Sequence, residues 1–264
     1  MLGPEGRAVA ANLLQALRFF GRAYAGSEIQ DVPDISLIFC GVNYAAFNAA
    51  LLAEPIENDK ARLTQAIETA ARRFRSRNLR WTCWLCDDFL GVMLRRETDR
   101  ILGRSGLRPL TEAPGMYADR LLDPLHMLPA LQVRPVDDAA SRKAFADIMS
   151  VSFEIPENIC RAIYGSDRAW STDFRGYIGV ADGTVVTTAG ASISGDVIGL
   201  YSVATLPAYR RRGYAEAIMR QVIKQARDQA GAKRTVLQST RSGLSLYQRM
   251  GYRTVTNFSV YIAD

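Results

Sequence analysis

The sequence is poor in the residues from which metal and redox sites are usually built. Its 264 residues contain one histidine, His126, and four cysteines, Cys40, Cys83, Cys86 and Cys160. One imidazole excludes histidine-rich metal centres and leaves a serine–histidine–aspartate triad only one possible base. Four scattered cysteines are not the dense disulfide framework of a small secreted protein. We therefore expect no metal cofactor.

Long apolar runs are also missing. The longest, Ile35 to Val42, is less than half of the roughly 20 residues that a membrane helix needs. The first residues, Met-Leu-Gly-Pro-Glu-Gly-Arg, show no apolar signal core behind a basic start. With 48% apolar and 23% charged residues the composition is globular, which excludes disordered and fibrous chains. These features predict a soluble, cytoplasmic protein that does not contact membranes.

Positive charge is present, but it is local. The net charge is +6, and residues 131–264 hold most of it, with 17 basic against 12 acidic side chains. Three of these charges are consecutive, Arg210-Arg211-Arg212. A feature of this size suits a phosphate group better than a nucleic-acid backbone. We therefore expect no nucleic-acid partner. Nucleic-acid binding remains a hypothesis, but it is weaker than the two functions that are described below.

Proline and aspartate near Leu128-Pro129-Ala130 suggest two domains, residues 1–130 and 131–264. Hydrophobic periodicity and turn residues predict an α+β order for the second domain. Its expected elements are a strand at 131–136, helices at 138–152 and from Pro156, three antiparallel strands within 177–203, a helix at 214–230, a strand at 235–239, a helix at 243–250 and a strand at 256–262.

The first domain is predicted to be a helix-rich α/β domain. We expect helices over 5–24, 44–53, 59–76 and 89–104, and strands at 81–86 and 116–122. From residue 59 onward this helix–strand–helix–strand order repeats the order that begins at residue 214.

The most informative segment runs from Leu200 to Ala215, where a strand ends, a loop turns and a helix begins. A helix N-terminus offers unpaired N–H groups and the positive end of the helix dipole. Gly213 permits close approach of a ligand, and the three preceding arginines add forked donors. Together they predict an anion site that suits a diphosphate. The segment lacks the Gly-Lys-Ser/Thr ending of a P-loop and the three glycines of a dinucleotide-binding loop.

This segment resembles the acyl-CoA motif of the GNAT N-acetyltransferase superfamily, Q/R-x-x-G-x-G/A, through Arg210-Arg211-Arg212-Gly213-Tyr214-Ala215. Val203-Ala204-Thr205-Leu206-Pro207 is similar to the strand that precedes it in that family, and Leu246-Tyr247-Gln248-Arg249-Met250-Gly251-Tyr252 to the family's L-Y-x-x-x-G-F/Y element. The resemblance covers about half the chain. It implies a mixed sheet flanked by helices over 131–264, and it makes the first domain a candidate for an incomplete, diverged copy without its own acyl-CoA site.

The resemblance implies acetyl transfer from acetyl-CoA to a primary amine by direct attack in a ternary complex. The backbone around Val203, Ala204 and Thr205 would hold the pantetheine arm, and Tyr247 would protonate the departing thiolate. The diphosphate would lie on the loop and helix start that comprise Arg210, Arg211, Arg212, Gly213, Tyr214 and Ala215. The acceptor would be a small-molecule or peptide amine, transfer of a longer acyl chain stays open, and so does a homodimer.

One departure from the family keeps a second function open. Many GNAT enzymes carry a general-base glutamate on the third strand of the meander, and residues 196–202 contain none. The base could be Glu154, Asp173 or a water chain, or the amine could arrive neutral. The alternative is a catalytically inactive acyl-CoA-binding protein that acts in regulation or interaction.

Several other residues have simpler structural explanations. The pair Cys83-Trp-Leu-Cys86 suggests a metal or redox site, but zinc needs four ligands, so buried strand cysteines are the favoured interpretation. His126 is interpreted as a linker or packing residue. Tyr44, Phe47 and Asn48 suit an acceptor pocket and ordinary helix packing equally well.

Overall fold

The computed structural model describes residues 2–170 and 173–263 and separates them into two compact units. Unit 2 comprises Met116–Arg253, whereas unit 1 comprises the residues up to Gly115 together with those from Thr254 onward. This division differs from the boundary expected at residue 130, because the last strand pairs with a strand of unit 1 and residues 116–130 cluster with unit 2. Among the described residues, no helix is long and apolar enough to cross a membrane.

Unit 2 follows the element order predicted for residues 131–264. Asp138 begins the first helix because its side chain accepts from the Ser141 amide at 2.7 Å, and Gly231 ends the long helix with a φ of 64°. The elements are β6 (Gln132–Pro135), α5 (Ala139–Phe153), α6 (Glu157–Tyr164), β7 (Phe174–Ala181), β8 (Thr184–Ser194), β9 (Val197–Thr205), α7 (Tyr214–Ala230), β10 (Arg234–Gln238) and α8 (Leu244–Arg249).

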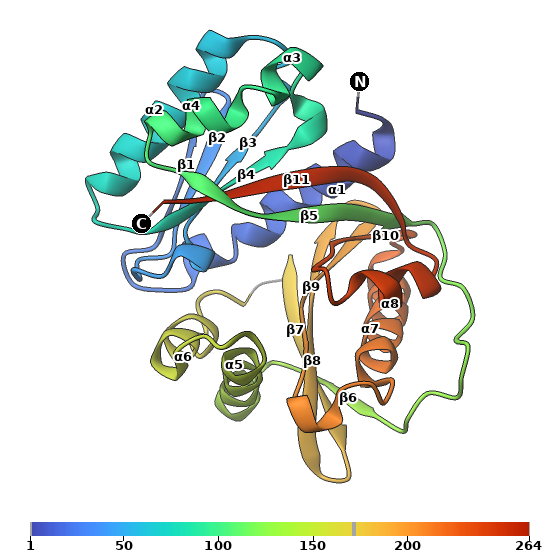
Figure 1. Ribbon diagram of the computed structural model, residues 1–264. Coiled ribbons are helices and arrows are strands. Elements are labelled where there is room, and N and C mark those ends of the chain that lie inside the picture. The colour runs from blue at the N-terminus through green and yellow to red at the C-terminus, as the bar shows by residue number, and fades with distance from the viewer. Residues whose placement is uncertain (1, 171–172, 264) are drawn as a thin grey trace. The chain divides into compact units, whose positions relative to one another are not determined.

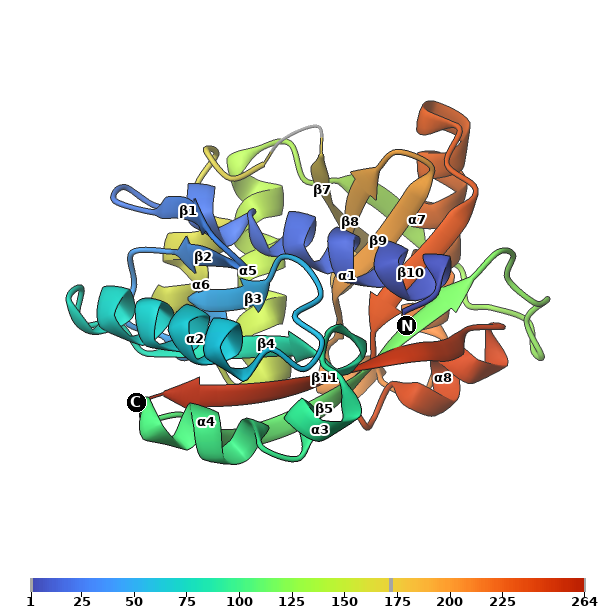
Figure 2. The same cartoon turned by 90° about the horizontal axis from the view of Figure 1, so that it is seen from above.

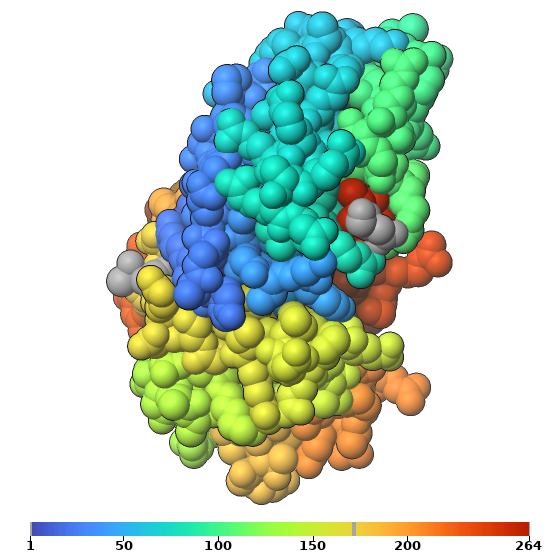
Figure 3. All heavy atoms as spheres, turned by 90° about the vertical axis from the view of Figure 1, so that its left-hand side faces the viewer, coloured from blue at the N-terminus to red at the C-terminus, as the bar shows by residue number. Residues whose placement is uncertain are grey.

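The strands of unit 2 lie in the order β10-β9-β8-β7-β6. All neighbours run antiparallel except β9 and β10, which are parallel because α7 connects them. Helices α5 and α6 cover one face of these strands and α7 covers the other (Figure 1). Viewed from the side, α5 and α6 form the yellow and yellow-green surface of the unit (Figure 3).

The core of unit 2 lies between α7 and the sheet. Ile218 and Val222 of α7 are fully buried against Ala189 of β8 and Ile198 of β9. These are the inward positions that the helical period of 214–230 predicted. The apolar face fixes α7 on the sheet and therefore fixes where the helix begins.

Unit 1 contains a second set of strands, with α2 running along them (Figure 2). Its strand order is β1-β2-β3-β4-β11-β5. The elements are α1 (Pro4–Leu17), β1 (Glu28–Val32), β2 (Ile35–Phe39), β3 (Ala49–Leu52), α2 (Lys60–Arg75), β4 (Trp81–Cys86), α3 (Val92–Arg95), α4 (Thr98–Arg104), β5 (Arg108–Ala118) and β11 (Arg253–Ala263), the last two of which cross the unit boundary.

The connectivity of unit 1 repeats that of unit 2. Strands β1, β2 and β3 are antiparallel neighbours, and β4 returns parallel to β3 after helix α2. Strands β7, β8, β9 and β10 with α7 show the same order and directions. The repeat suggested by the sequence is therefore present in the fold.

The sequence prediction was wrong at several places in unit 1. The helix expected over 44–53 is a short 3₁₀ turn followed by strand β3, because those residues pair with strands on both sides. The helix expected over 5–24 ends at Leu17, and that over 89–104 is divided into α3 and α4. Strands β1 and β2 were not predicted, and the strand expected at 116–122 ends at Ala118.

Candidate functional site

Strand β9 continues well beyond its pairing with β10. The parallel pairs join Val197, Ile198 and Gly199 to β10, and β9 continues to Thr205. Because β10 ends at Gln238, two residues after the partner of Gly199, the residues from Ser202 to Thr205 extend past the end of β10. This leaves the end of β9 able to form strand-like hydrogen bonds with a ligand.

A β-bulge lies within this unpaired part of β9. Thr188 opposes Ala204 and Gly190 opposes Tyr201, so Ser202 and Val203 together stand against the single residue Ala189. Ser202 has a φ of 49°, in the left-handed region that non-glycine residues rarely adopt. Bulges redirect backbone groups and are frequent beside active sites.

Two buried threonines of β8 fix the direction of the backbone at the bulge. Thr188 Oγ1 donates to the Ser202 carbonyl at 2.9 Å, and Thr187 Oγ1 donates to the Ala204 carbonyl at 2.6 Å. In a trans peptide the next N–H points opposite to the carbonyl. The amides of Val203 and Thr205 therefore point away from β8, toward the side where β10 is no longer paired.

The turn between β9 and α7 carries two left-handed residues, Arg211 at a φ of 60° and Gly213 at 86°. Gly213 is the N-cap of α7 and provides no side-chain cap, and the first bond into the helix runs from the Ala217 amide to the Gly213 carbonyl at 2.9 Å. The amides from Tyr214 to Glu216 consequently have no acceptor within the helix. An anion at this helix end would accept from these amides.

The three arginines of the turn are all exposed but make different contacts. The Arg210 guanidinium donates to the carbonyl of Thr205 at 3.0 Å and to that of Ser152 at 3.2 Å. The Arg212 guanidinium lies 5.6 Å from the ring centre of Tyr209. The sequence assigned all three arginines to the coenzyme site, whereas the structure shows different contacts for Arg210 and Arg212.

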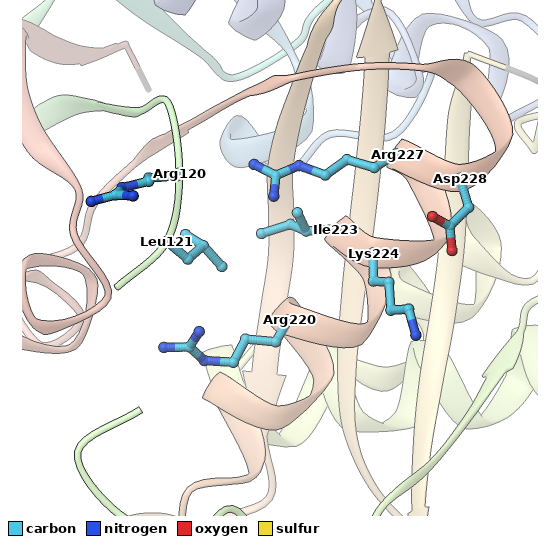
Figure 4. A pocket seen from close by; sticks show the side chains of 7 residues that line it. All are labelled: Arg120, Leu121, Arg220, Ile223, Lys224, Arg227 and Asp228. Atoms are coloured by element: carbon cyan, nitrogen blue, oxygen red, sulfur yellow. The ribbon is translucent and has the colours of Figure 1, made fainter. Parts of the chain in front are cut away.

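The segment that follows β5 lies along α7 and reaches the turn. Arg220 donates to the Leu122 carbonyl at 2.6 Å, and Arg227 to the Asp119 carbonyl at 3.2 Å. Both side chains extend toward this segment beside a hollow of about 290 Å³ (Figure 4). Farther along, Pro129 lies so close to Gly213 that a Cβ on the glycine would be 2.9 Å from its Cδ. A glycine is therefore required at position 213 for two reasons: its φ is in the left-handed region, and the contact with Pro129 leaves no room for a Cβ.

Tyr247 lies in α8, half-buried, with its ring centre 6.1 Å from that of Tyr252. Burial raises the pKa of the Tyr247 phenol to about 12, so the hydroxyl is protonated at neutral pH. Tyr247 and Val203 both pack against the core cluster beneath α7. Val203, expected to hold the pantetheine arm, and Tyr247, expected to protonate the thiolate, thus border the same cluster.

The two carboxylates proposed as bases occupy different places. Glu154 is exposed at the C-terminal end of α5 with a φ of 55°, two residues after Ser152, which contacts Thr205. Asp173 is exposed just before β7, where its carbonyl accepts from the Ile193 amide. The sequence did not single out Thr187, Thr188, Ser152 or Ser202, because none belongs to a recognisable motif.

The other candidate residues are part of the structure of unit 1. The Asn48 side chain is fully buried and bonds the Cys40 amide and the carbonyls of Val42 and Arg80, so it holds a turn. Cys83 is buried in β4, and burial raises the pKa of its thiol. No group of three histidine, cysteine or acidic residues suited to a metal ion is found within the described residues.

Comparison with known proteins adds independent information. Residues 142–252 match the model of the acetyltransferase (GNAT) family, and no curated protein gives a significant sequence match. A GCN5-related N-acetyltransferase from Kribbella flavida superposes with a TM-score of 0.74 at 20% identity, covering 100% of this chain and 96% of the other. A tandem GNAT protein from the clavulanic acid biosynthesis pathway superposes with a TM-score of 0.57 at 10% identity, covering 100% of this chain and 96% of the other. A GCN5-related N-acetyltransferase from Sphaerobacter thermophilus superposes with a TM-score of 0.59 at 15% identity, covering 97% of this chain and 91% of the other.

Proposed function

We propose that the chain is a GNAT-type acyltransferase, because residues 142–252 match the model of that family, and that it moves an acetyl group from acetyl-CoA to a primary amine. The transfer is direct, with both substrates bound together. The acceptor is a small-molecule or peptide amine. We also propose that the enzyme works in the cytoplasm and uses neither a metal nor nucleic acid.

One observation carries this proposal: β9 extends past its pairing with β10, and the turn that follows leads into a helix whose first amides have no side-chain cap. The Val203 and Thr205 amides suit the amide-rich pantetheine arm, which can bond to a strand edge. The amides from Arg211 to Ala215 suit the diphosphate, with positive charge from Arg211 and Arg212 beside them. The residues present therefore fit the donor that the family uses.

The chemistry needs few groups. The amine nitrogen attacks the thioester carbonyl carbon, the carbon–sulfur bond breaks, and the amine proton and the thiolate must each be accommodated. A backbone amide near Val203 would stabilise the negative charge that develops on the carbonyl oxygen. Holding both substrates in one geometry supplies much of the acceleration.

Tyr247 is the proposed donor to the departing sulfur. Its pKa of about 12 keeps it protonated, whereas an ordinary thiol has a pKa near about 8.5. Complete proton transfer from phenol to thiolate is thus uphill. The phenol therefore acts mainly by hydrogen bonding to the developing thiolate, and the proton released by the amine completes the balance.

Strand β9 contains no acidic residue in place of the family's glutamate. The amine is therefore proposed to react as the neutral species or to lose its proton through water, with Glu154 the acidic side chain nearest in sequence to the contact between α5 and β9. The same absence supports the alternative function, an acyl-CoA-binding regulatory or interaction protein without turnover.

The decisive experiment is an acetyl-CoA consumption assay against a panel of primary amines, including aminoglycosides, polyamines, amino acids and peptides with free N-termini. The proposal predicts turnover with at least one class and an acetylated product by mass spectrometry. Tight acetyl-CoA binding without turnover on any amine would support the alternative.

A further inference from the structure

Helix α5 is tied to the unpaired end of β9 at its last turn. The Arg210 guanidinium bridges the carbonyls of Thr205 and Ser152, at 3.0 Å and 3.2 Å. Ser152 Oγ also donates to the Thr205 carbonyl, at 3.4 Å. One arginine of the turn thus joins three segments: the end of β9, the loop before α7 and the end of α5.

A second tie lies three residues earlier on β9. The buried hydroxyl of Tyr164, in α6, is hydrogen-bonded to the side chain of Ser202. Ser202 is the left-handed residue of the bulge, and such a residue needs surrounding contacts to persist. With β10 unpaired there, the threonines of β8 hold one side of this backbone, and the α5–α6 pair supplies contacts that a neighbouring strand would otherwise make.

These contacts occupy both the Thr205 carbonyl and the Arg210 side chain. A carbonyl oxygen has two lone pairs, and that of Thr205 already accepts from two donors. The Arg210 guanidinium is turned toward backbone carbonyls of its own chain. Arg211 and Arg212 are also exposed, and they lie next in sequence to the uncapped helix end.

We propose that Arg210 is a positioning residue for acetyl transfer: it holds the Ser202–Thr205 backbone in the shape that receives the acetyl-pantetheine arm, and it does not bind the diphosphate. The inference rests on the proposed function. It replaces the expectation from the sequence that all three arginines contact the coenzyme.

Two acetyl donors distinguish positioning from phosphate binding. Acetyl-pantetheine lacks the diphosphate, so a residue that binds phosphate matters only for acetyl-CoA. We expect Arg210→Ala to lower kcat/KM about tenfold with both donors, and Arg212→Ala to lower it with acetyl-CoA alone. Arg210→Lys should not restore activity, because a single ammonium lacks the fork that spans two carbonyls. A loss confined to acetyl-CoA, or full rescue by Arg210→Lys, would overturn the proposal.

Hydrogen–deuterium exchange without any substrate provides an independent test. The Ser202–Leu206 amides should exchange faster in Arg210→Ala than in the wild type, and Arg212→Ala should leave them unchanged. Ser152→Ala, which keeps the charge of the turn, should show a smaller increase. Unchanged exchange in Arg210→Ala would refute the positioning role. Absence of turnover by the wild type with either donor would instead refute the proposed function.

Discussion

The junction between β3 and α2 in unit 1 and the junction between β9 and α7 in unit 2 hold the same place in a repeated fold, yet they are chemically opposite. Helix α2 is capped by the Asp59 side chain, which accepts from the Arg62 amide at 3.0 Å, and Glu54 and Glu57 precede it. Helix α7 has no side-chain cap and follows three arginines. An anion is disfavoured at the first junction and favoured at the second.

The strands that lead into the two helices differ as well. Strand β3 spans Ala49–Leu52 and is paired with β4 through Leu51, almost to its end. Strand β9 pairs with β10 only as far as Gly199 and continues to Thr205. The comparison gives a physical reason for placing the proposed acyl-CoA site in unit 2: β9 extends past its parallel partner and α7 starts without a side-chain cap, whereas β3 stays paired almost to its end and α2 is capped.

The largest effect is expected from Tyr247→Phe in unit 2. Loss of one hydrogen-bond donor to a charge that develops in the transition state typically costs about 10²-fold or more, so kcat should fall by about that factor while acetyl-CoA affinity stays nearly constant. Because the pKa of Tyr247 is raised to about 12, the phenol is protonated throughout the range from about pH 6 to about pH 10. The ratio of wild-type to variant kcat should therefore be independent of pH across that range.

Tyr252→Phe is the matched control, since Tyr252 is buried and its ring packs against that of Tyr247. We expect this variant to keep most of the activity. Equal losses in the two variants would mean that ring packing, and not the Tyr247 hydroxyl, is what the reaction requires.

The next effect is expected from Gly213→Ala. A left-handed alanine costs about 1–2 kcal/mol, and its Cβ would be placed 2.9 Å from Pro129 Cδ. Acetyl-CoA affinity should therefore fall by about tenfold or more, as measured by calorimetry. Gly103→Ala in α4 is the control, because its Cβ would meet no atom within 4 Å. Equal affinities for Gly213→Ala and the wild type would remove the turn from the site.

The smallest effect is expected from Asp59→Ala, which uncaps α2. Loss of an N-cap side chain typically costs about 1 kcal/mol, so thermal unfolding should begin a few degrees lower. Because β3 stays paired and the acidic residues remain, no second acyl-CoA site should appear. A second binding event in this variant would show that the cap alone separates the two junctions.

Much of unit 2 could be predicted because its signals are local. The bounds of α7 follow from apolar spacing that ends at Gly231, and the start of α5 follows from Asp138. The uncapped turn at Gly213 could also be located, since arginines and a glycine between a strand and a helix are visible in the sequence. The structure added the direction of the Val203 and Thr205 amides, which depends on Thr187 and Thr188 of a neighbouring strand.

Unit 1 was harder to predict because tertiary contacts override its local pattern. Residues 44–53 have helical composition, but Asn48 holds a turn and Ala49–Leu52 form a strand between two others. Strand β2 is buried at every position, so it shows none of the alternation that identifies a strand. The role of Arg210 was hidden for the same reason, because Ser152 is distant in sequence.

Titration of the protein with acetyl-CoA in a calorimeter tests the central claim most directly. The account predicts one binding event per chain, weakened by Gly213→Ala and unaffected by Asp59→Ala. Absence of binding at millimolar acetyl-CoA, or two equivalent sites per chain, would contradict it.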